Sequence, residues 1–208
     1  LLVSDTGVRG LVILNRARNV RFNEDPHSPT VWAESGANFG LVARQAAQRG
    51  WSGLEWAAGI PGTIGGAVVG NAGAHGGDMA GNLIVAEILH LSKEDAGVNY
   101  RREEWSVEKM AYAYRSSILK RIPDQGVVLS ALLHLQPGDR ETILEKMDEL
   151  TAYRKRTQPP GASMGSMFKN PPGDYAGRLI EAAGLKGSRQ GNVQISQLHA
   201  NFFINDGQ

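Results

Sequence analysis

Apolar and polar positions alternate over short distances in the first part of the chain. Leu11–Leu14 is a short apolar run after two glycines, and Thr30–Glu34 alternates around a tryptophan, so both predict β-strands. From Phe39 the apolar residues follow helical spacing, with Asn38 in the N-cap position and Gly50 beyond the end. This part of the chain therefore predicts two strands followed by one amphipathic helix.

The middle of the chain is dominated by strand patterns. Leu83–Leu91 is rich in β-branched residues, and Val98–Arg102 follows a turn-like segment, which predicts an antiparallel hairpin. Val127–Leu135 is almost continuously apolar, as is typical of a buried strand.

A long helix is expected next. It begins near Asp139, has one apolar face built by Ile143, Met147 and Leu150, and ends before Pro159–Gly161. A Pro/Gly break after a long helix is a common place for a domain boundary.

The last part of the chain predicts a short helix at Asp174–Ala183, closed by Gly184, and a strand at Ala200–Ile204. Strands and helices are mixed along the chain without regular βαβ spacing. This order favours an α+β fold over a doubly wound sheet.

Composition narrows the functional classes. The chain has 208 residues, 41% hydrophobic, and 22 Lys+Arg against 21 Asp+Glu, so no strong field favours nucleic acid or an anionic membrane. It has no cysteine, which excludes thiolate chemistry and agrees with a cytoplasmic location. No apolar run approaches the ~18 residues of a membrane span. Because the chain does not begin with Met, we expect it to be a fragment.

The stretch Gly59–Asp78 carries eight glycines in twenty residues. Such a backbone serves tight turns or a ligand that lies on the main chain, and its amides suit a phosphate or the polar edge of a flavin or nucleotide. Interleaved Ile64 and Val68 argue against a flexible linker, while a purely structural loop stays an alternative. The two common nucleotide fingerprints, GxxxxGK[ST] and GxGxxG, do not fit.

Two further segments carry candidate chemistry. In YAYRSS, Arg115 presents a planar guanidinium, the natural partner of a carboxylate or phosphate, although a surface arginine stacked on a tyrosine is an equal alternative. In GASMGSMFKNP, Ser166 suits hydrogen bonding or proton donation better than acyl transfer, because no histidine completes a triad. Its alternative is a turn serine that caps the backbone. No metal site is expected, and His199 lacks a second ligand at suitable spacing.

Taken in order, these segments resemble the UDP-N-acetylenolpyruvoylglucosamine reductase family. The matching motifs are GIPGTIGGAVVGNAGA at Gly59–Ala74, YRSS at Tyr114–Ser117 and GSMFKNP at Gly165–Pro171. AGRLIEAAGLKG at Ala176–Gly187 and HANFFIN at His199–Asn205 add support. RTQP at Arg156–Pro159 is a further match, and the short link between YRSS and RTQP is similar to the compact type, which lacks an extra tyrosine loop.

The resemblance implies a fold and a reaction. The fold is α+β, with an FAD-binding fold of the vanillyl-alcohol-oxidase kind at 1–137, a connecting helix at 138–158 and a smaller α+β substrate-binding domain at 159–208. The reaction converts UDP-N-acetylglucosamine enolpyruvate to UDP-N-acetylmuramate in peptidoglycan precursor synthesis. NADPH reduces FAD, a hydride passes to C3 of the enolpyruvyl group, and C2 is protonated.

The resemblance also implies roles for individual residues. Arg115 would stabilise charge on the substrate carboxylate, and Ser166 would donate the proton. The expected FAD-binding residues are Gly59, Ile60, Pro61, Gly62, Thr63, Gly65, Asn71, Gly73 and Ala74. The expected substrate-binding residues are Tyr114, Gln158, Lys169, Asn170 and His199.

The partner is then a small UDP-sugar, with no nucleic acid or membrane, and the protein a cytoplasmic monomer. The family's phosphate loop would precede Leu1 and its catalytic glutamate would follow Gln208, as expected of a fragment. Two alternatives stay open: a non-catalytic flavin- or nucleotide-sugar-binding protein, and another oxidase of the same flavin fold.

Overall fold

The computed structural model describes residues 3–94, 97–122 and 126–207. The chain forms two compact units. The larger comprises residues 14–151, and the smaller comprises residues 1–13 together with 152–208.

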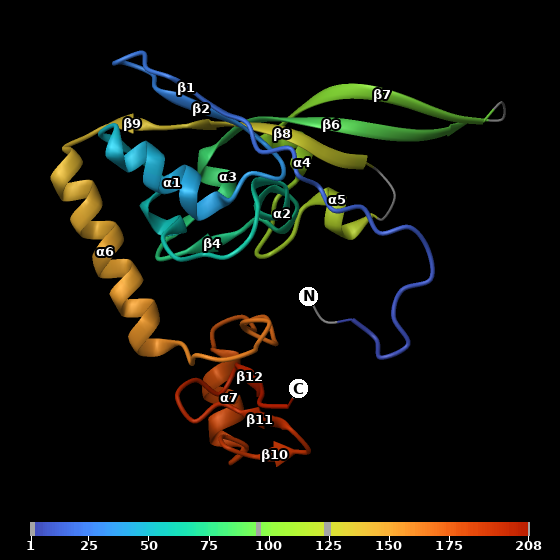
Figure 1. Cartoon of the computed structure of the whole chain (residues 1–208), viewed down its shortest axis with the longest axis vertical. Coiled ribbons are helices and arrows are strands. Elements are labelled where there is room, and N and C mark those ends of the chain that lie inside the picture. Colours follow the sequence, from blue (N-terminus) through green and yellow to red (C-terminus); the bar gives the residue numbers. More distant parts are fainter. Residues whose placement is uncertain (1–2, 95–96, 123–125, 208) are drawn as a thin grey trace. The chain divides into compact units, whose positions relative to one another are not determined.

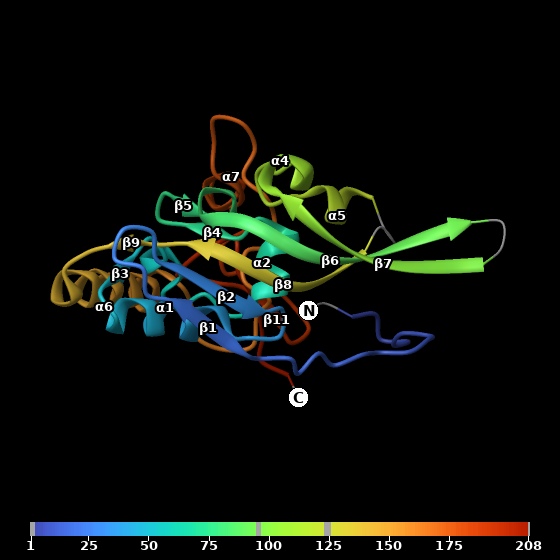
Figure 2. The same cartoon turned by 90° about the horizontal axis from the view of Figure 1, so that it is seen from above.

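A five-stranded antiparallel sheet is the centre of the larger unit (Figures 1 and 2). Its strand order is β1 (Val20–Asn23), β2 (Thr30–Glu34), β8 (Gly126–His134), β6 (Leu83–Glu94) and β7 (Gly97–Ser106). The predicted strand at 30–34, the hairpin and the buried strand are confirmed. The turn between β6 and β7 falls partly outside the described residues.

Helices cover one side of this sheet, below it in Figure 1. Helix α1 (Phe39–Gln48) follows the predicted amphipathic pattern: Asn38 Oδ1 accepts a hydrogen bond from the Leu41 amide, and Gly50 has a φ of 74°. Alternate residues of β2, Val31 and Ala33, are fully buried on the helix side. Burial of this apolar face is the main force that holds the helices against the sheet.

Helix α6 (Arg140–Thr157) confirms the predicted long helix, and Ile143 and Met147 are buried in the core of the larger unit. The remaining short elements of this unit connect the sheet and the helices. They are β3 (Trp51–Ser52), η1 (Glu55–Ala57), α2 (Ile64–Gly70), β4 (Gly73–Ala74), β5 (Gly77–Asp78), α3 (Met79–Asn82), α4 (Val107–Met110), α5 (Ile118–Arg121) and β9 (Gln136–Pro137).

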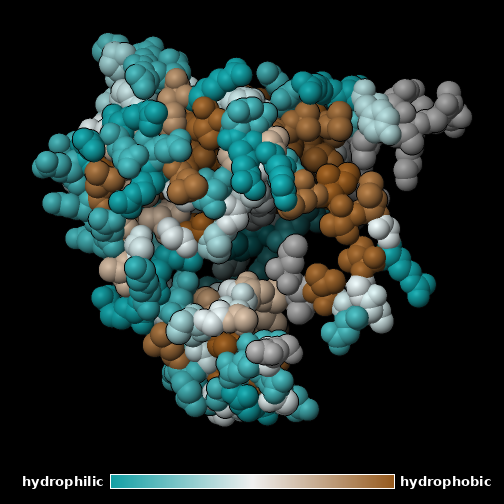
Figure 3. All heavy atoms as spheres, viewed as in Figure 1, coloured by the Kyte–Doolittle hydropathy of each residue, from teal (hydrophilic) through white to brown (hydrophobic). Residues whose placement is uncertain are grey.

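The strand predicted at Leu11–Leu14 is wrong. The segment forms no helix or strand and pairs with no described strand, and its four side chains are 71–86% exposed. An apolar run becomes a strand only when a neighbouring strand accepts its backbone hydrogen bonds and a core covers its side chains. Figure 3 shows brown hydrophobic groups exposed on one face of the molecule, and these four residues belong to the exposed hydrophobic set.

The smaller unit contains helix α7 (Ala176–Ala182) and an antiparallel sheet of β10 (Arg189–Gln190), β11 (Val193–Ile195) and β12 (Phe203–Asn205). The predicted helix is confirmed with a later start, and Gly184, with a φ of 72°, lies just beyond its end. The predicted last strand also begins later, at Phe203. Both units mix helices with antiparallel strands, so the α+β class is confirmed.

Candidate active site

The sequence had suggested that the glycine-rich stretch is a loop throughout. The structure shows that part of it is helical. Helix α2 occupies 7 of its residues and begins after Thr63, whose Oγ1 accepts a hydrogen bond from the Gly66 amide at 3.3 Å. Ile64 and Val68, four residues apart, are fully buried. Their burial outweighs the low helix propensity of the glycines between them.

The glycines of this stretch fall into two groups. A Cβ at Gly65 would lie 2.8 Å from the Ser35 Cβ, and a Cβ at Gly73 would lie 2.8 Å from the Asp78 Cβ. The protein's own packing therefore requires glycine at both positions. Gly62, by contrast, has a φ of 122° and no atom within 4 Å of where a Cβ would stand, so its backbone is open to a ligand.

Free backbone donors lie at the same place. The amides of Gly62 and Thr63 make no hydrogen bond with the described part of the chain, and both residues are exposed. Gly59, with a φ of 68°, and Pro61 are exposed beside them. Exposed amides on an uncrowded glycine backbone fit the phosphates or polar ring edge of FAD. Ile60 and Ala74, also expected to bind FAD, are half-buried in this stretch.

Tyr114 and Arg115 form the tip of a tight turn. The backbones of Ala113 and Ser116 exchange both hydrogen bonds, each 3.0 Å long. Arg115 takes a φ of 55°, in the left-handed region that side-chain-bearing residues rarely adopt. Such strain clusters at functional sites.

The Arg115 guanidinium has no carboxylate partner among the described residues. Its Cζ lies 5.6 Å from the centre of the Tyr114 ring, so the contact with a neighbouring tyrosine considered from the sequence is present as a cation–π contact. Such a contact uses no hydrogen-bond donor and leaves the guanidinium N–H groups available to an anion.

Tyr112 stands at the base of this turn. Its hydroxyl is buried and has no hydrogen-bond partner in the described part of the chain. Burial, and then the nearby Asp78 carboxylate, raise the pKa of Tyr112 above its ordinary value, so the hydroxyl stays protonated. The sequence had singled out Tyr112 only as part of its motif, because periodicity does not show which hydroxyl lacks a partner.

The smaller unit has a pocket of about 360 Å³ that brings together three predicted residues, Ser166, Asn170 and His199. Tyr175, Arg178 and Glu181 also line it, and sequence reasoning did not single them out. Arg178 forms an ion pair with Asp174, four residues earlier, and that helical spacing of opposite charges was the signal that could have found Arg178.

Asn201 fixes the backbone next to Ser166. Its Oδ1 accepts from the Phe168 amide and its Nδ2 donates to the Phe168 carbonyl, both at 2.9 Å. Its own carbonyl accepts from the Met167 amide at 2.9 Å. Asn201 is 3% exposed, whereas Ser166 is exposed, so a buried amide holds the serine segment and leaves the serine accessible.

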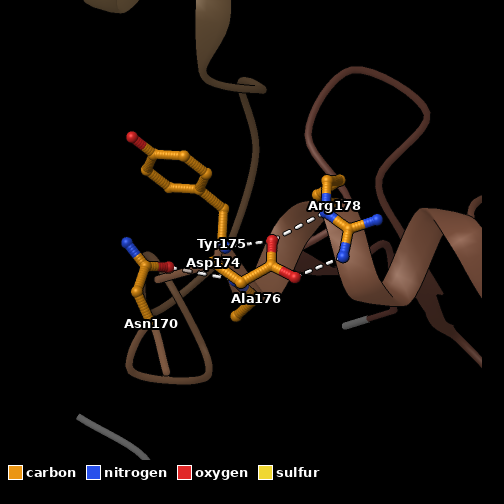
Figure 4. A network of polar contacts seen from close by, with 5 residues as sticks. All are labelled: Asn170, Asp174, Tyr175, Ala176 and Arg178. Atoms are coloured by element: carbon orange, nitrogen blue, oxygen red, sulfur yellow. Dashed lines mark hydrogen bonds and ion pairs between the residues drawn. The ribbon is translucent and has the colours of Figure 1, made fainter. Parts of the chain in front are cut away.

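A polar network includes three residues that line this pocket, Asn170, Tyr175 and Arg178 (Figure 4). Asn170 Oδ1 accepts from the Ala176 amide at 3.1 Å, and Asp174 forms a bidentate ion pair with Arg178. The Arg178 side chain, followed by the Tyr175 amide, lowers the pKa of Asp174 to about 2. The Tyr175 ring points away from the ion pair.

The three other predicted substrate residues, Tyr114, Gln158 and Lys169, do not line the pocket, and Tyr114 is exposed at the arginine turn of the larger unit. Lys169 is exposed. Gln158 is half-buried just beyond α6, and its backbone N–H donates a hydrogen bond to the Arg154 carbonyl. Within residues 3–94, 97–122 and 126–207, no group of three acidic or histidine side chains could hold a metal ion. No helix in these ranges is long and apolar enough to cross a membrane.

Comparison with known proteins assigns both parts of the chain. Residues 2–89 match the model of an FAD binding domain, and residues 156–208 match that of the UDP-N-acetylenolpyruvoylglucosamine reductase C-terminal domain. The reductase of Chloroflexus aggregans is 47% identical over 100% of this chain and 69% of its own length. That of Rubrobacter xylanophilus is 44% identical over 100% of this chain and 66% of its own length.

A solved structure agrees with these matches. The crystal structure of the reductase from Thermus caldophilus superposes with a TM-score of 0.73 at 40% identity, covering 85% of this chain and 62% of that one. The likeness thus extends from sequence to fold. The chain belongs to the UDP-N-acetylenolpyruvoylglucosamine reductase family.

Proposed function

We propose that this protein is an NADPH-dependent FAD enzyme that reduces UDP-N-acetylglucosamine enolpyruvate to UDP-N-acetylmuramate for peptidoglycan synthesis. Family membership and the match to an FAD binding domain support the flavin reductase activity. The structural observation that carries the proposal is the Arg115 guanidinium, which is held at a left-handed turn without a carboxylate partner in the described chain.

FAD, once bound and reduced by NADPH, supplies the hydride that adds to C3 of the enolpyruvyl group. Negative charge then develops on the conjugated carboxylate of the substrate. Arg115 is suited to stabilise this charge because its fork of donors matches both carboxylate oxygens. The exposed amides of Gly62 and Thr63 hold the cofactor in this proposal.

Ser166 donates its hydroxyl proton to C2 and completes the addition across the double bond. Its exposure at the pocket and the left-handed Gly165 before it, with a φ of 83°, support this role. Asn170 and His199 bind the UDP-sugar from the same pocket, while Tyr114, Lys169 and Gln158 contact it from outside the pocket lining.

A visible absorption spectrum of the purified full-length protein tests the cofactor, and NADPH oxidation tests the reaction. We expect flavin absorbance, and NADPH oxidation that depends on the enolpyruvyl UDP-sugar. Bound flavin without turnover would favour the non-catalytic binding protein. NADPH oxidation that is independent of this substrate would favour another flavin oxidase.

We also propose a cytoplasmic monomer that acts on small molecules only. The nearly balanced charge argues against nucleic-acid or anionic-membrane partners, and the absence of cysteine agrees with a cytoplasmic location. Light scattering on the full-length protein tests it, and a dimer mass would contradict it.

A further inference from the structure

The arginine turn is bonded to the glycine-rich stretch on both of its sides. Before the turn, Asn71 Nδ2 donates to the Ala113 carbonyl at 3.2 Å. After the turn, Ser117 Oγ donates to the Val69 carbonyl at 2.7 Å. Asn71 is 5% exposed and Ser117 is 0% exposed, so both donor side chains are shielded from water, whereas the acceptor residue Ala113 is exposed.

The orientation of the Asn71 amide is set by its partners. Oδ1 accepts from the Ala80 amide at 3.0 Å, and Nδ2 also lies 3.4 Å from Asp78 Oδ2. A backbone N–H requires the oxygen and a carboxylate requires the nitrogen, so a flipped amide would lose these bonds. Asn71 also ends α2 with a φ of 43°, which ties its position to that of the helix.

Arg115 needs such support because its φ of 55° is unfavourable for a residue with a side chain. A strained conformation persists only where the surroundings over-determine it. Ala113 accepts the first of the two bonds and Ser117 donates the second, and these two residues lie on either side of the turn tip. Without them the turn can relax, and the guanidinium then leaves the position set for it.

We propose that Asn71 and Ser117 are positioning residues for Arg115. They fix the arginine relative to the C-terminal end of α2 in the glycine-rich stretch. The family resemblance implied an FAD contact for Asn71, but its side-chain bonds go to Asp78, Ala113 and Ala80, so in this role Asn71 acts through the arginine turn and not by contact with FAD. The inference rests on the proposed function, in which Arg115 stabilises the substrate carboxylate.

Asn71→Gly is the sharpest variant, because glycine keeps the left-handed backbone and removes only the amide side chain. Ser117→Ala removes the second bond and carries the same test if Asn71→Gly does not fold. Ser130→Ala is the matched control: Ser130 is 3% exposed and its hydroxyl donates to Glu87 instead.

In the full-length FAD-bound enzyme, both variants should keep flavin reduction by NADPH. Reoxidation by the enolpyruvyl UDP-sugar should slow about ten- to hundredfold, as expected of a misplaced catalytic group. In an Arg115→Lys background, Asn71→Gly should add little further loss, because the two residues act as one unit. Additive losses, or loss of FAD from Asn71→Gly, would overturn the proposal.

Hydrogen exchange gives a readout that needs no activity. The amides of Ala113 and Ser116 should exchange faster in Asn71→Gly and Ser117→Ala, and at the wild-type rate in Ser130→Ala. Unchanged exchange in the first two variants would also overturn the proposal. If the wild-type enzyme shows no substrate-dependent reoxidation, the proposed function fails, while the exchange rates still decide whether these bonds hold the turn.

Discussion

Arg115 differs from the other arginines of the described chain in its backbone. It is the arginine with a positive φ, and it lies at the tip of a two-residue turn. For Arg115→Lys we expect a loss of about 10²–10³-fold in flavin reoxidation by the substrate, the cost of removing one transition-state donor. A lysine provides a point charge and cannot reproduce the bidentate fork.

Stopped-flow absorbance of the flavin measures this reoxidation directly. Flavin reduction by NADPH serves as the internal control and should stay near the wild-type rate. A lysine variant that reoxidises at the wild-type rate would remove Arg115 from the chemistry.

Ser166 is exposed at the pocket of the smaller unit, while the buried Asn201 holds the adjoining backbone. We therefore expect Ser166→Ala to keep its fold and its reduction by NADPH. Reoxidation by the enolpyruvyl UDP-sugar should collapse, because a positioned acid contributes about 10²–10⁴-fold. Equal losses in the two half-reactions would contradict the proton-donor role, and Ser163→Ala, three residues earlier in the same segment, is the control.

At the scale of elements, the pair β4–β5 depends on close approach to a tryptophan. A Cβ at Gly77 would lie 2.3 Å from an atom of the Trp56 ring, which is 6% exposed and bonded to Asn82. Gly77→Ala should therefore lower the free energy of unfolding by about 1–3 kcal/mol, as other overpacked cores do. Urea unfolding followed by circular dichroism measures the change.

Gly70→Ala is the control for that experiment. No protein atom lies within 4 Å of where its Cβ would stand, at the end of α2. Alanine favours a helix over glycine by up to about 1 kcal/mol, so stability should stay constant or rise. A loss as large as that of Gly77→Ala would show that crowding against Trp56 is not the cause.

One carboxylate of the β6–β7 hairpin, that of Glu103, accepts hydrogen bonds from several donors. Glu103 accepts from Trp105 Nε1 at 2.8 Å and Lys109 Nζ at 2.7 Å, and it pairs with Arg101. The Lys109 bond, then the Trp105 bond, lower the pKa of Glu103 from 4.5 to about 2. A carboxylate whose pKa is lowered by folding stabilises the protein at pH values above its pKa in the unfolded chain. This stabilisation is lost as the pH falls through its pKa in the folded protein.

We therefore expect wild type to be more stable than Glu103→Gln near pH 7. The difference should shrink as the pH falls from about 4.5 to 2. Thermal unfolding of both proteins across this range, followed by circular dichroism, measures it. A difference that is constant with pH would mean that the charge of Glu103 is not the stabilising factor.

At the scale of the molecule, buried apolar side chains are unevenly divided. The core cluster lies within residues 31–147 and includes Phe39, Leu54 and Leu133. In the described part of the smaller unit, the buried hydrophobic residues are Ala176, Ala200 and Phe202. Since stability follows buried apolar area, the two units should not be equally stable.

Hydrogen exchange on the full-length protein tests this difference. Amides of β12 should open with a lower free energy than amides of β8, and the substrate should raise protection in the smaller unit if it binds there. Equal opening free energies would indicate a single cooperative unfolding unit.

Much of the fold could be predicted because local patterns there coincide with the final packing. Helix α1 shows its N-cap, its apolar face and its closing glycine within about a dozen neighbouring residues. The strand at 30–34 alternates because one of its faces is buried. Leu11–Leu14 failed because an apolar run does not show whether a partner strand exists.

The candidate site, like the fold, has parts that could be predicted from the sequence and parts that could not. Motif order along the chain identified the glycine-rich stretch, Arg115 and Ser166, and the family match agrees with that order. The helix inside the stretch was missed, because seven residues with three glycines have no helical tendency until Ile64 and Val68 are buried. The domain limits and the individual site residues stay predictions.

Residue types, their order and their local spacing were enough to establish the family, the α+β class and the chemical groups available. Folding added what depends on contacts between residues distant in sequence: the left-handed Arg115, its bonds through Asn71 and Ser117, and the pocket around Ser166. The physical reason is that periodicity reports only which face of an element is buried. Hydrogen-bond partners and close approaches are set by packing between elements, after the chain has folded.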